Sequence, residues 1–229
     1  MRTAAVLPVK RFELAKQRLG ASVADGVRIA LARAMVTDVL QALAETSGID
    51  STIVVTRERM LAGAAREMGA HVIEDETESG QPAAVELGVR HALDRGLERV
   101  LCVPGDCPGL DPAELERLLA GSPAASETEV VILPDRHGTG TNGLLLCPPD
   151  AIPPAFGPDS CARHLALARA AGVPCRVEQL PSLLLDIDTG ADLEVLRERL
   201  AAQGPRAPRT RAVLGLPASP NAVSLTAPA

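Results

Sequence analysis

The chain has 229 residues, a net charge of −6, and only two residues of the Phe, Trp and Tyr class, Phe12 and Phe156. Nucleic-acid-binding proteins use basic surfaces and exposed aromatic rings, so this composition argues against such a partner. The apolar run that ends at Pro8 is too short for a signal peptide or a membrane span. Five cysteines without a C-x-x-C pair predict reduced thiols in a cytoplasmic protein with no membrane contact.

Short apolar runs alternate along the chain with apolar residues at helical spacing, which predicts an α/β protein with a mostly parallel sheet. The runs that predict strands are residues 4–9, 51–56, 71–74, 99–104, 129–133 and 144–147. The segments that predict helices are 23–44, 57–68, 82–95, a helix that opens at Asp111, 160–171 and 192–202. Late strands or extended segments are expected at 173–180 and 183–188. We predict one three-layer domain over residues 1–203, followed by a flexible Pro- and Ala-rich tail over residues 204–229.

The only two lysines, Lys10 and Lys16, lie in the segment directly after the first expected strand. An ammonium is a compact point charge that enters crowded phosphate sites, whereas a guanidinium is planar and larger. The segment lacks a P-loop pattern, and no G-x-G-x-x-G follows any expected strand. Lys10, Lys16 and Arg18 therefore suggest a side-chain clamp for a triphosphate. A coincidence on a solvated turn is the alternative.

Three aspartates are candidate metal ligands. Asp106 follows the strand expected at 99–104, within Pro-Gly-Asp-Cys-Pro, and is either a turn residue or a ligand for a hard cation. Asp186 and Asp188 would share one face of an extended strand, where their charges repel unless a cation compensates. This arrangement favours Mg²⁺ bound by all three carboxylates. The pair fits neither a haloacid-dehalogenase phosphatase motif nor an EF-hand loop.

Two glycine-containing segments offer groups for binding a ligand. Residues 135–143 include Thr141 and Asn142, and their small side chains and backbone N–H groups can surround an anion. A simple hairpin connection would explain the same residues. Gly80 and Gln81 either contact a purine base or only begin the next helix.

The segment around Ser160 offers a second anion site. Ser160 is expected to cap the helix at 160–171, whose first N–H groups would receive a carboxylate or a phosphate. Arg163 or His164, one turn further on, would add to this site. Capping alone would also explain Ser160, and His164 is alternatively an ordinary surface histidine.

Five motifs in fixed order resemble the guanylyltransferase family that makes the activated phospholactyl or phosphoenolpyruvyl donor for coenzyme F420. They are L-P-V-K followed by A-K-x-R-L, P-G-D-C-P, D-R-x-G-x-G-T-N-G-L-L-L, F-G-x-x-S-x-x-x-H and D-I-D-T-x-x-D-L. The resemblance covers residues 3–200, and an ordered set is more specific than any single motif. It implies a nucleotide-diphospho-sugar transferase fold of the glycosyltransferase-A type. It also implies that GTP reacts with phosphoenolpyruvate or 2-phospho-L-lactate and releases pyrophosphate.

The resemblance further implies roles for individual residues. The catalytic groups would be Lys10, Lys16, Arg18 and Asp106. The nucleotide would contact Pro8, Lys10, Lys16, Gly80, Gln81, Gly105 and Asp106. The phosphocarboxylate would contact Thr141, Asn142, Gly157 and Ser160, and Mg²⁺ would be held by Asp106, Asp186 and Asp188. This chain departs from the family pattern where the nucleotide base would bind. The family often has Gly-Leu-Asn there, whereas this chain has Gly-Gln-Pro at residues 80–82.

Two other functions remain open at this stage. The chain could be a nucleotidyltransferase for another acceptor, such as a sugar phosphate or the molybdenum cofactor. Those relatives usually begin with a Gly-rich loop, which this chain replaces with its lysine segment. A non-catalytic nucleotide-binding subunit is the other alternative, although closely spaced carboxylates have little use there. The expected partners are GTP and a small phosphocarboxylate, and the sequence is compatible with a homodimer.

Overall fold

The computed structural model describes residues 1–121, 128–202 and 204–218, and its strands form one seven-stranded sheet in the order β3-β2-β1-β4-β6-β5-β7. The strands are β1 Thr3–Val9, β2 Ser51–Thr56, β3 His71–Ile73, β4 Arg99–Cys102, β5 Glu129–Pro134, β6 Thr141–Cys147 and β7 Cys175–Val177. Only β6 is antiparallel to its neighbours β4 and β5, while the other pairings in the described residues are parallel. The predicted mostly parallel sheet is confirmed.

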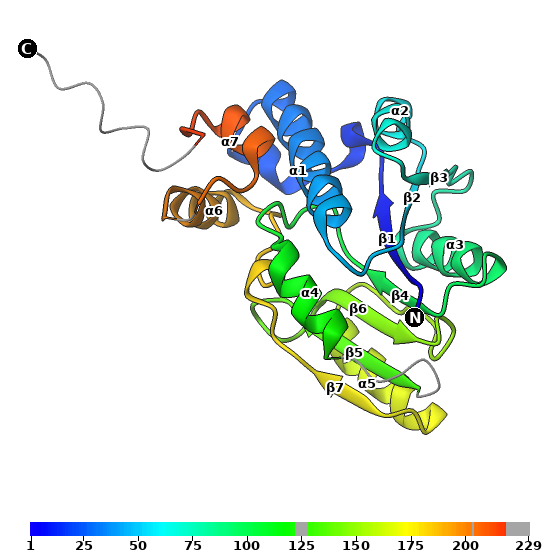
Figure 1. Ribbon diagram of the computed structural model, residues 1–229. Coiled ribbons are helices and arrows are strands. Elements are labelled where there is room, and N and C mark those ends of the chain that lie inside the picture. Colours follow the sequence, from blue (N-terminus) through cyan, green and yellow to red (C-terminus); the bar gives the residue numbers. More distant parts are fainter. Residues whose placement is uncertain (122–127, 203, 219–229) are drawn as a thin grey trace, which may run out of the picture.

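Helices cover both faces of the sheet (Figure 1). They are α1 Asp25–Glu45, α2 Arg59–Glu67, α3 Gln81–Asp94, α4 Pro112–Ala120, α5 Ser160–Ala171, α6 Gly190–Ala202 and α7 Pro208–Leu214. Short 3-10 helices span Phe12–Leu14, Gln17–Ala21 and Pro181–Leu183. No helix within the described residues is long and apolar enough to cross a membrane.

Strand β1 shows how the three layers arise from the pleat of the sheet. Successive side chains of a strand point to opposite faces. Ala5 and Leu7 pack in a cluster with α1, α2 and α4, while Ala4 and Val6 pack in a second cluster with α3 and α5. All four side chains are completely buried. The continuous apolar run predicted from the sequence is therefore explained by helices on both faces.

The prediction of a flexible tail from residue 204 is wrong for residues 208–214, which form α7. This helix packs on α1, and its Leu214 belongs to a third apolar cluster with Leu31 and Met35 of α1. Asp38 of α1 accepts a hydrogen bond from the backbone N–H of Thr210, 2.7 Å away, which satisfies a free donor at the start of α7. Residues 219–229 of the predicted tail lie outside the described residues.

Of the two alternatives for residues 183–188, a late strand or an extended segment, the strand is wrong. A 3-10 helix ends at Leu183, and no strand contains Asp186 or Asp188. The apolar residues of this segment enter two different clusters. Leu183 packs in the cluster with α1 and α4, whereas Leu185 and Ile187 pack in the cluster with α6 and α7. An apolar run in the sequence does not distinguish this arrangement from a buried strand.

Candidate active site

The candidate site is a cavity of about 800 Å³ at the edge of the sheet where the parallel strands end. Strand β6 runs the other way, so its first residues reach the same edge. Ligands in parallel α/β sheets bind at this edge. Every candidate residue from the sequence lines this one cavity: Pro8, Lys10, Lys16, Arg18, Gly80, Gln81, Gly105, Asp106, Thr141, Asn142, Gly157, Ser160, Asp186 and Asp188. The grouping of these residues was therefore predicted correctly.

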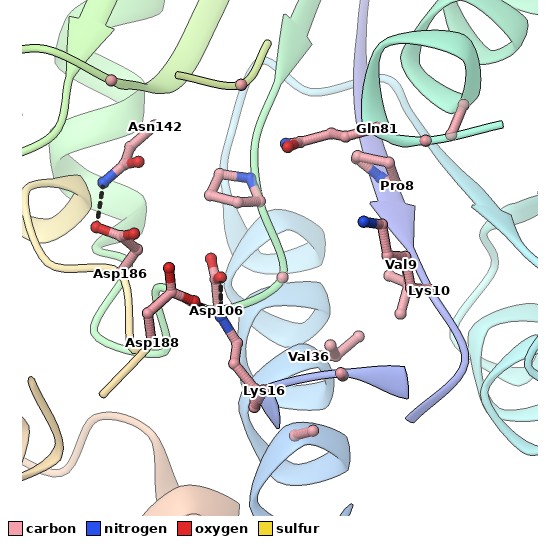
Figure 2. A pocket seen from close by; sticks show the side chains of 18 of the residues that line it. Pro8, Val9, Lys10, Lys16, Val36, Gln81, Asp106, Asn142, Asp186 and Asp188 are labelled. Atoms are coloured by element: carbon pink, nitrogen blue, oxygen red, sulfur yellow. Dashed lines mark hydrogen bonds and ion pairs between the residues drawn. The ribbon is translucent and has the colours of Figure 1, made fainter. Parts of the chain in front are cut away.

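Lys16 lies between two of the candidate metal ligands (Figure 2). Its Nζ donates to Asp106 Oδ2 and, over 2.8 Å, to Asp188 Oδ1. Burial alone would lower the pKa of Lys16, but the two carboxylates outweigh burial and raise the pKa above its usual value. Lys16 therefore stays charged and compensates the repulsion between Asp106 and Asp188.

Asp106 is placed by a tight turn after β4. A Cβ atom on the preceding Gly105 would lie 2.8 Å from a methyl carbon of Val36 in α1, so a larger residue would push the turn away from this helix. One carboxylate oxygen, Oδ2, binds Lys16. The other, Oδ1, is buried and has no hydrogen-bond partner in the described part of the protein. An unpaired buried carboxylate oxygen is costly and is a suitable ligand for a cation.

Asp186 lies beside Asp106 in a loop held by hydrogen bonds. Ile187 N donates to the carbonyl of Asp106 over 3.2 Å, and Asn142 Nδ2 donates to Asp186 Oδ1, also over 3.2 Å. Burial and the negative charge of Asp106 raise the pKa of Asp186. Three carboxylates therefore line the cavity together, and two of them, those of Asp106 and Asp188, contact the Lys16 ammonium.

The structure gives observations both against the predicted Mg²⁺ site and in its favour. Among the described residues, no three or more His, Cys, Asp or Glu side chains are arranged to hold a metal ion as they stand. Lys16 lies where the sequence suggested a cation shared by Asp106 and Asp188. The unpartnered Oδ1 of Asp106 and the neighbouring Asp186 nevertheless provide oxygen ligands. Binding of Mg²⁺ stays a prediction.

Comparison with known proteins identifies the family. The family described as "Guanylyl transferase CofC like" matches residues 3–200. The chain belongs to this family. A phosphoenolpyruvate guanylyltransferase from Conexibacter woesei is 51% identical over 214 residues, covering 93% of this chain and 96% of the relative. A 3-phospho-D-glycerate guanylyltransferase from Colwellia psychrerythraea is 38% identical over 197 residues, covering 86% of this chain and 91% of the relative.

A solved structure supports the fold. A nucleotide-diphospho-sugar transferase from Desulfovibrio desulfuricans G20 superposes with a TM-score of 0.74 at 20% identity, covering 94% of this chain and 95% of the other. Together with the family match, this confirms the predicted family, the nucleotide-diphospho-sugar transferase fold and the assignment as a nucleotidyltransferase.

This guanylyltransferase also uses an aspartate whose role the sequence analysis missed. Asp192 Oδ2 accepts from Thr189 N over 2.7 Å and from Asp188 N over 3.0 Å, while Thr189 Oγ1 accepts from Asp192 N. This reciprocal pair is a capping box at the start of α6. Its pattern, Thr followed three residues later by an acidic residue, is visible in the sequence. Asp192 therefore fixes the backbone that carries Asp188.

Further missed residues lie at the end of the cavity formed by Gly80 and Gln81. Arg57, Asp75 and Glu78 also line the cavity. Arg57 adds a cation that follows β2, just as Lys10 follows β1. Gly80 has φ of 105°, a conformation that favours glycine, and it precedes the first turn of α3. Arg57 and Asp75 each come just after a strand, which is the sequence signal that would have identified them.

Two expectations about α5 are wrong. Ser160 is the first residue of the helix and makes no side-chain cap; Asp159 occupies the N-cap position in a left-handed conformation with φ of 54°. His164 is not a surface residue, because its exposed fraction is 0%. Ser160 is buried at the cavity wall, beside Thr141 and Gly157.

Proposed function

We propose that this protein transfers the guanylyl group of GTP to phosphoenolpyruvate and releases pyrophosphate. The observation that supports this proposal most directly is the content of a single cavity. The cavity is lined by cationic side chains of the lysine segment and Arg57, by the carboxylates of Asp106, Asp186 and Asp188, and by the hydroxyls of Thr141 and Ser160. A long polyanion and a small second anion fit this set of groups. The relative with 51% identity is named for the same reaction.

In the proposed reaction, a phosphate oxygen of phosphoenolpyruvate attacks the α-phosphorus of GTP. A new P–O bond forms, the bond from the α-phosphorus to the bridging oxygen breaks, and pyrophosphate leaves with the electron pair. The attacking phosphate is already ionised, so no general base is needed. The protein contributes by positioning the reactants and by neutralising charge. Lys10 and Arg18 have exposed side chains in the cavity and are the proposed contacts of the triphosphate.

Mg²⁺ is the proposed cofactor. The fit rests on the partnerless Oδ1 of Asp106 and on the neighbouring carboxylates of Asp186 and Asp188. When bound, the ion would neutralise phosphate charge and favour departure of pyrophosphate. Because Lys16 now lies between Asp106 and Asp188, we expect its ammonium to shift toward the phosphates once the cation is bound.

Asp75 is the proposed selector of guanine. Guanine presents N–H donors at N1 and at its exocyclic N2, whereas adenine has an acceptor at N1 and no amino group at C2. A carboxylate accepts hydrogen bonds from both guanine donors. Asp75 is 8% exposed, lines the cavity near Gly80, and uses Oδ1 to accept from Glu78 N over 3.0 Å. Its Oδ2 is the oxygen available to a base.

A second candidate acceptor is 3-phospho-D-glycerate, because the relative with 38% identity is named for it. The family resemblance adds 2-phospho-L-lactate and a place in coenzyme F420 biosynthesis. All three acceptors carry one phosphate and one carboxylate. They differ only at the carbons between these groups. We expect a polar cavity wall to select strongly for the two negative groups and only weakly among the three carbon skeletons.

The test is pyrophosphate release from GTP and Mg²⁺ with each acceptor supplied separately. We expect phosphoenolpyruvate to give the highest kcat/KM, and a higher value with 3-phospho-D-glycerate would favour the second candidate. Asp106→Asn should lower turnover about 100-fold or more, since it removes the charge of a proposed Mg²⁺ ligand and so weakens binding of the cation that would neutralise the phosphates. Asp150→Asn, at an exposed position outside the cavity, is the matched control. Absence of pyrophosphate with every acceptor would contradict the proposal.

Nucleotide selection needs a separate assay. The wild-type protein should prefer GTP to ATP and CTP at equal concentration. Asp75→Asn should raise KM for GTP about 10-fold, because it replaces one hydrogen-bond acceptor with a donor that faces the donors of guanine. An unchanged KM for GTP would remove Asp75 from the base site.

A further inference from the structure

His164 is completely buried, and both of its ring nitrogens have partners. Nε2 accepts a hydrogen bond from the backbone N–H of Ala155 over 2.9 Å, and Nδ1 lies 3.0 Å from Thr141 Oγ1. Phe156 contacts the ring edge-on, with centroids 5.2 Å apart and planes at 74°. The ring therefore has one orientation, fixed on three sides.

These partners determine where the proton of His164 lies. A backbone N–H is only a donor, so Nε2 must accept and carries no hydrogen. In a neutral imidazole the hydrogen is then on Nδ1. The ring is neutral at physiological pH, since burial and the nearby Arg163 lower the pKa of His164 to about 4. Nδ1–H therefore donates to Thr141 Oγ1.

We infer that His164 is a positioning residue that leaves the hydrogen of the Thr141 hydroxyl free to donate toward the part of the cavity lined by Gly157 and Ser160. A hydroxyl has one hydrogen and accepts through its lone pairs. Because Thr141 Oγ1 accepts from His164, its own hydrogen is left for another partner. Thr141 is 7% exposed and lines the cavity with Gly157 and Ser160. Because Thr141 lines the cavity, a ligand bound there is the partner that we assign to this hydrogen.

A hydroxyl whose hydrogen is free for a ligand favours an anion. It stabilises a carboxylate or phosphate oxygen, because a hydrogen bond donated to a charged oxygen is stronger than one donated to a neutral oxygen. The backbone is fixed by the same histidine, since Ala155 N, its other partner, lies two residues before Gly157 in the loop that borders the cavity. This inference rests on the proposed function for the identity of the anion, which we take to be the phosphocarboxylate acceptor.

Two substitutions separate the two hydrogen bonds of His164. In His164→Asn, the amide nitrogen is bonded to Cγ, as Nδ1 is, so it can still donate to Thr141 while the acceptor for Ala155 is lost. In His164→Gln, the amide oxygen is as many bonds from Cβ as Nε2, so it can accept from Ala155 while the donor to Thr141 is lost. Thr141→Val removes the hydroxyl in a side chain of similar shape.

The main measurement is KM for phosphoenolpyruvate and for GTP in each variant and in the double variant Thr141→Val with His164→Gln. We expect Thr141→Val and His164→Gln each to raise KM for phosphoenolpyruvate about 10-fold, with KM for GTP unchanged. His164→Asn should stay within about 3-fold of the wild type. The double variant should be no worse than Thr141→Val alone, because both changes act through the same hydroxyl.

Two outcomes would overturn the inference. One is an effect of His164→Gln that is equally large in the Thr141→Val background, since this would show that His164 does not act through the hydroxyl of Thr141. The other is a ¹⁵N spectrum of His164 in the wild-type protein with the proton on Nε2. The spectrum requires no substrate, so it remains decisive if no acceptor releases pyrophosphate, which would contradict the proposed function instead.

Discussion

Lys16 shows at the scale of one residue what composition predicts and what it does not. The rarity of lysine identified Lys16 as a residue with a special role. The sequence did not reveal its partners, because Asp106 and Asp188 are 90 and 172 residues away along the chain. Only the folded sheet brings them together. Two of the three expected metal ligands, Asp106 and Asp188, bind the ammonium of Lys16 in this structure.

The ion pairs of Lys16 give the first prediction. Lys16→Met leaves Asp106 and Asp188 repelling each other, and we expect the free energy of unfolding to fall by about 1–3 kcal/mol. The figure is below that of a fully buried pair because the Asp188 side chain is 45% exposed. Millimolar Mg²⁺ should restore part of the loss by replacing the ammonium. Urea unfolding with and without Mg²⁺ measures both effects.

The control for this prediction is Arg18→Met. Arg18 is 4.0 Å from Asp188, and its side chain is 78% exposed. An exposed ion pair contributes little, so the free energy of unfolding should change by less than about 0.5 kcal/mol. Equal stability of Lys16→Met and the wild type would show that the Lys16 ion pairs contribute nothing to folding.

The second prediction concerns the shape of the cation. Lys16→Arg keeps the charge, but the Lys16 side chain is only 11% exposed and a planar guanidinium needs more room. We expect kcat for pyrophosphate release to fall about 10- to 100-fold, with the circular dichroism spectrum unchanged. Wild-type turnover in this variant would mean that only the charge of Lys16 matters.

Among the elements, strands β1, β2 and β4 and helices α1 and α3 followed from periodicity, because both faces of each strand are buried under helices. The segment around Asp186 was wrongly predicted as a strand, since a run of leucines does not indicate which cluster each side chain enters. Both Asp186 and Asp188 nevertheless line the cavity, and their role in metal binding stays a prediction. Spacing in the sequence therefore predicted the location of the carboxylates better than their backbone conformation.

The capping box of α6 gives the third prediction. Asp192→Ala removes the acceptor of the Thr189 and Asp188 N–H groups and should lower the free energy of unfolding by about 1–2 kcal/mol at pH 7. The hydrogen bonds from Thr189 and Asp188, together with Arg136, outweigh burial and hold the pKa of Asp192 below its usual value. Its contribution is therefore complete above about pH 4 and is lost as the pH falls through the folded-state pKa.

Urea unfolding of the wild type and Asp192→Ala between pH 3 and 7 tests this prediction. The difference in stability between the two proteins should shrink as the pH falls below about 4. Asp192→Asn keeps an oxygen acceptor but loses the charge. Its free energy of unfolding at pH 7 should therefore lie between those of the wild type and Asp192→Ala. A difference that stays constant with pH would show that the carboxylate charge of Asp192 does not contribute.

Over the whole molecule, the sequence predicted the sheet, the two covering layers and the group of residues around one cavity. It missed α7, because a segment rich in Pro, Ala and Arg lacks the apolar periodicity that identifies a helix. Arg211 shows why α7 folds nevertheless. This side chain is 1% exposed and donates to backbone carbonyls, among them those of Arg206 and Pro217. Such contacts depend on the folded backbone around them and leave no pattern in the sequence.

The third apolar cluster links α7 to the active site and gives the last prediction. It contains Leu214 of α7, Leu31 and Met35 of α1, Leu19 of the lysine segment, and Ile187 between the two aspartates. A chain ending at residue 202 exposes part of this cluster and should lose about 2–4 kcal/mol of unfolding free energy. A chain ending at residue 218 keeps all the contacts described for α7, so its free energy of unfolding should equal that of the full chain.

The same truncation should reduce catalysis, because Leu19 and Ile187 hold the two loops that bring Lys16 to Asp188. We expect the chain ending at residue 202 to show a lower kcat for pyrophosphate release at a temperature where it is still folded, while the chain ending at residue 218 keeps the full value. If the shorter chain loses stability but retains full kcat, the two loops are held without α7. In that case the C-terminal helix serves folding only, and the cavity is complete within residues 1–202.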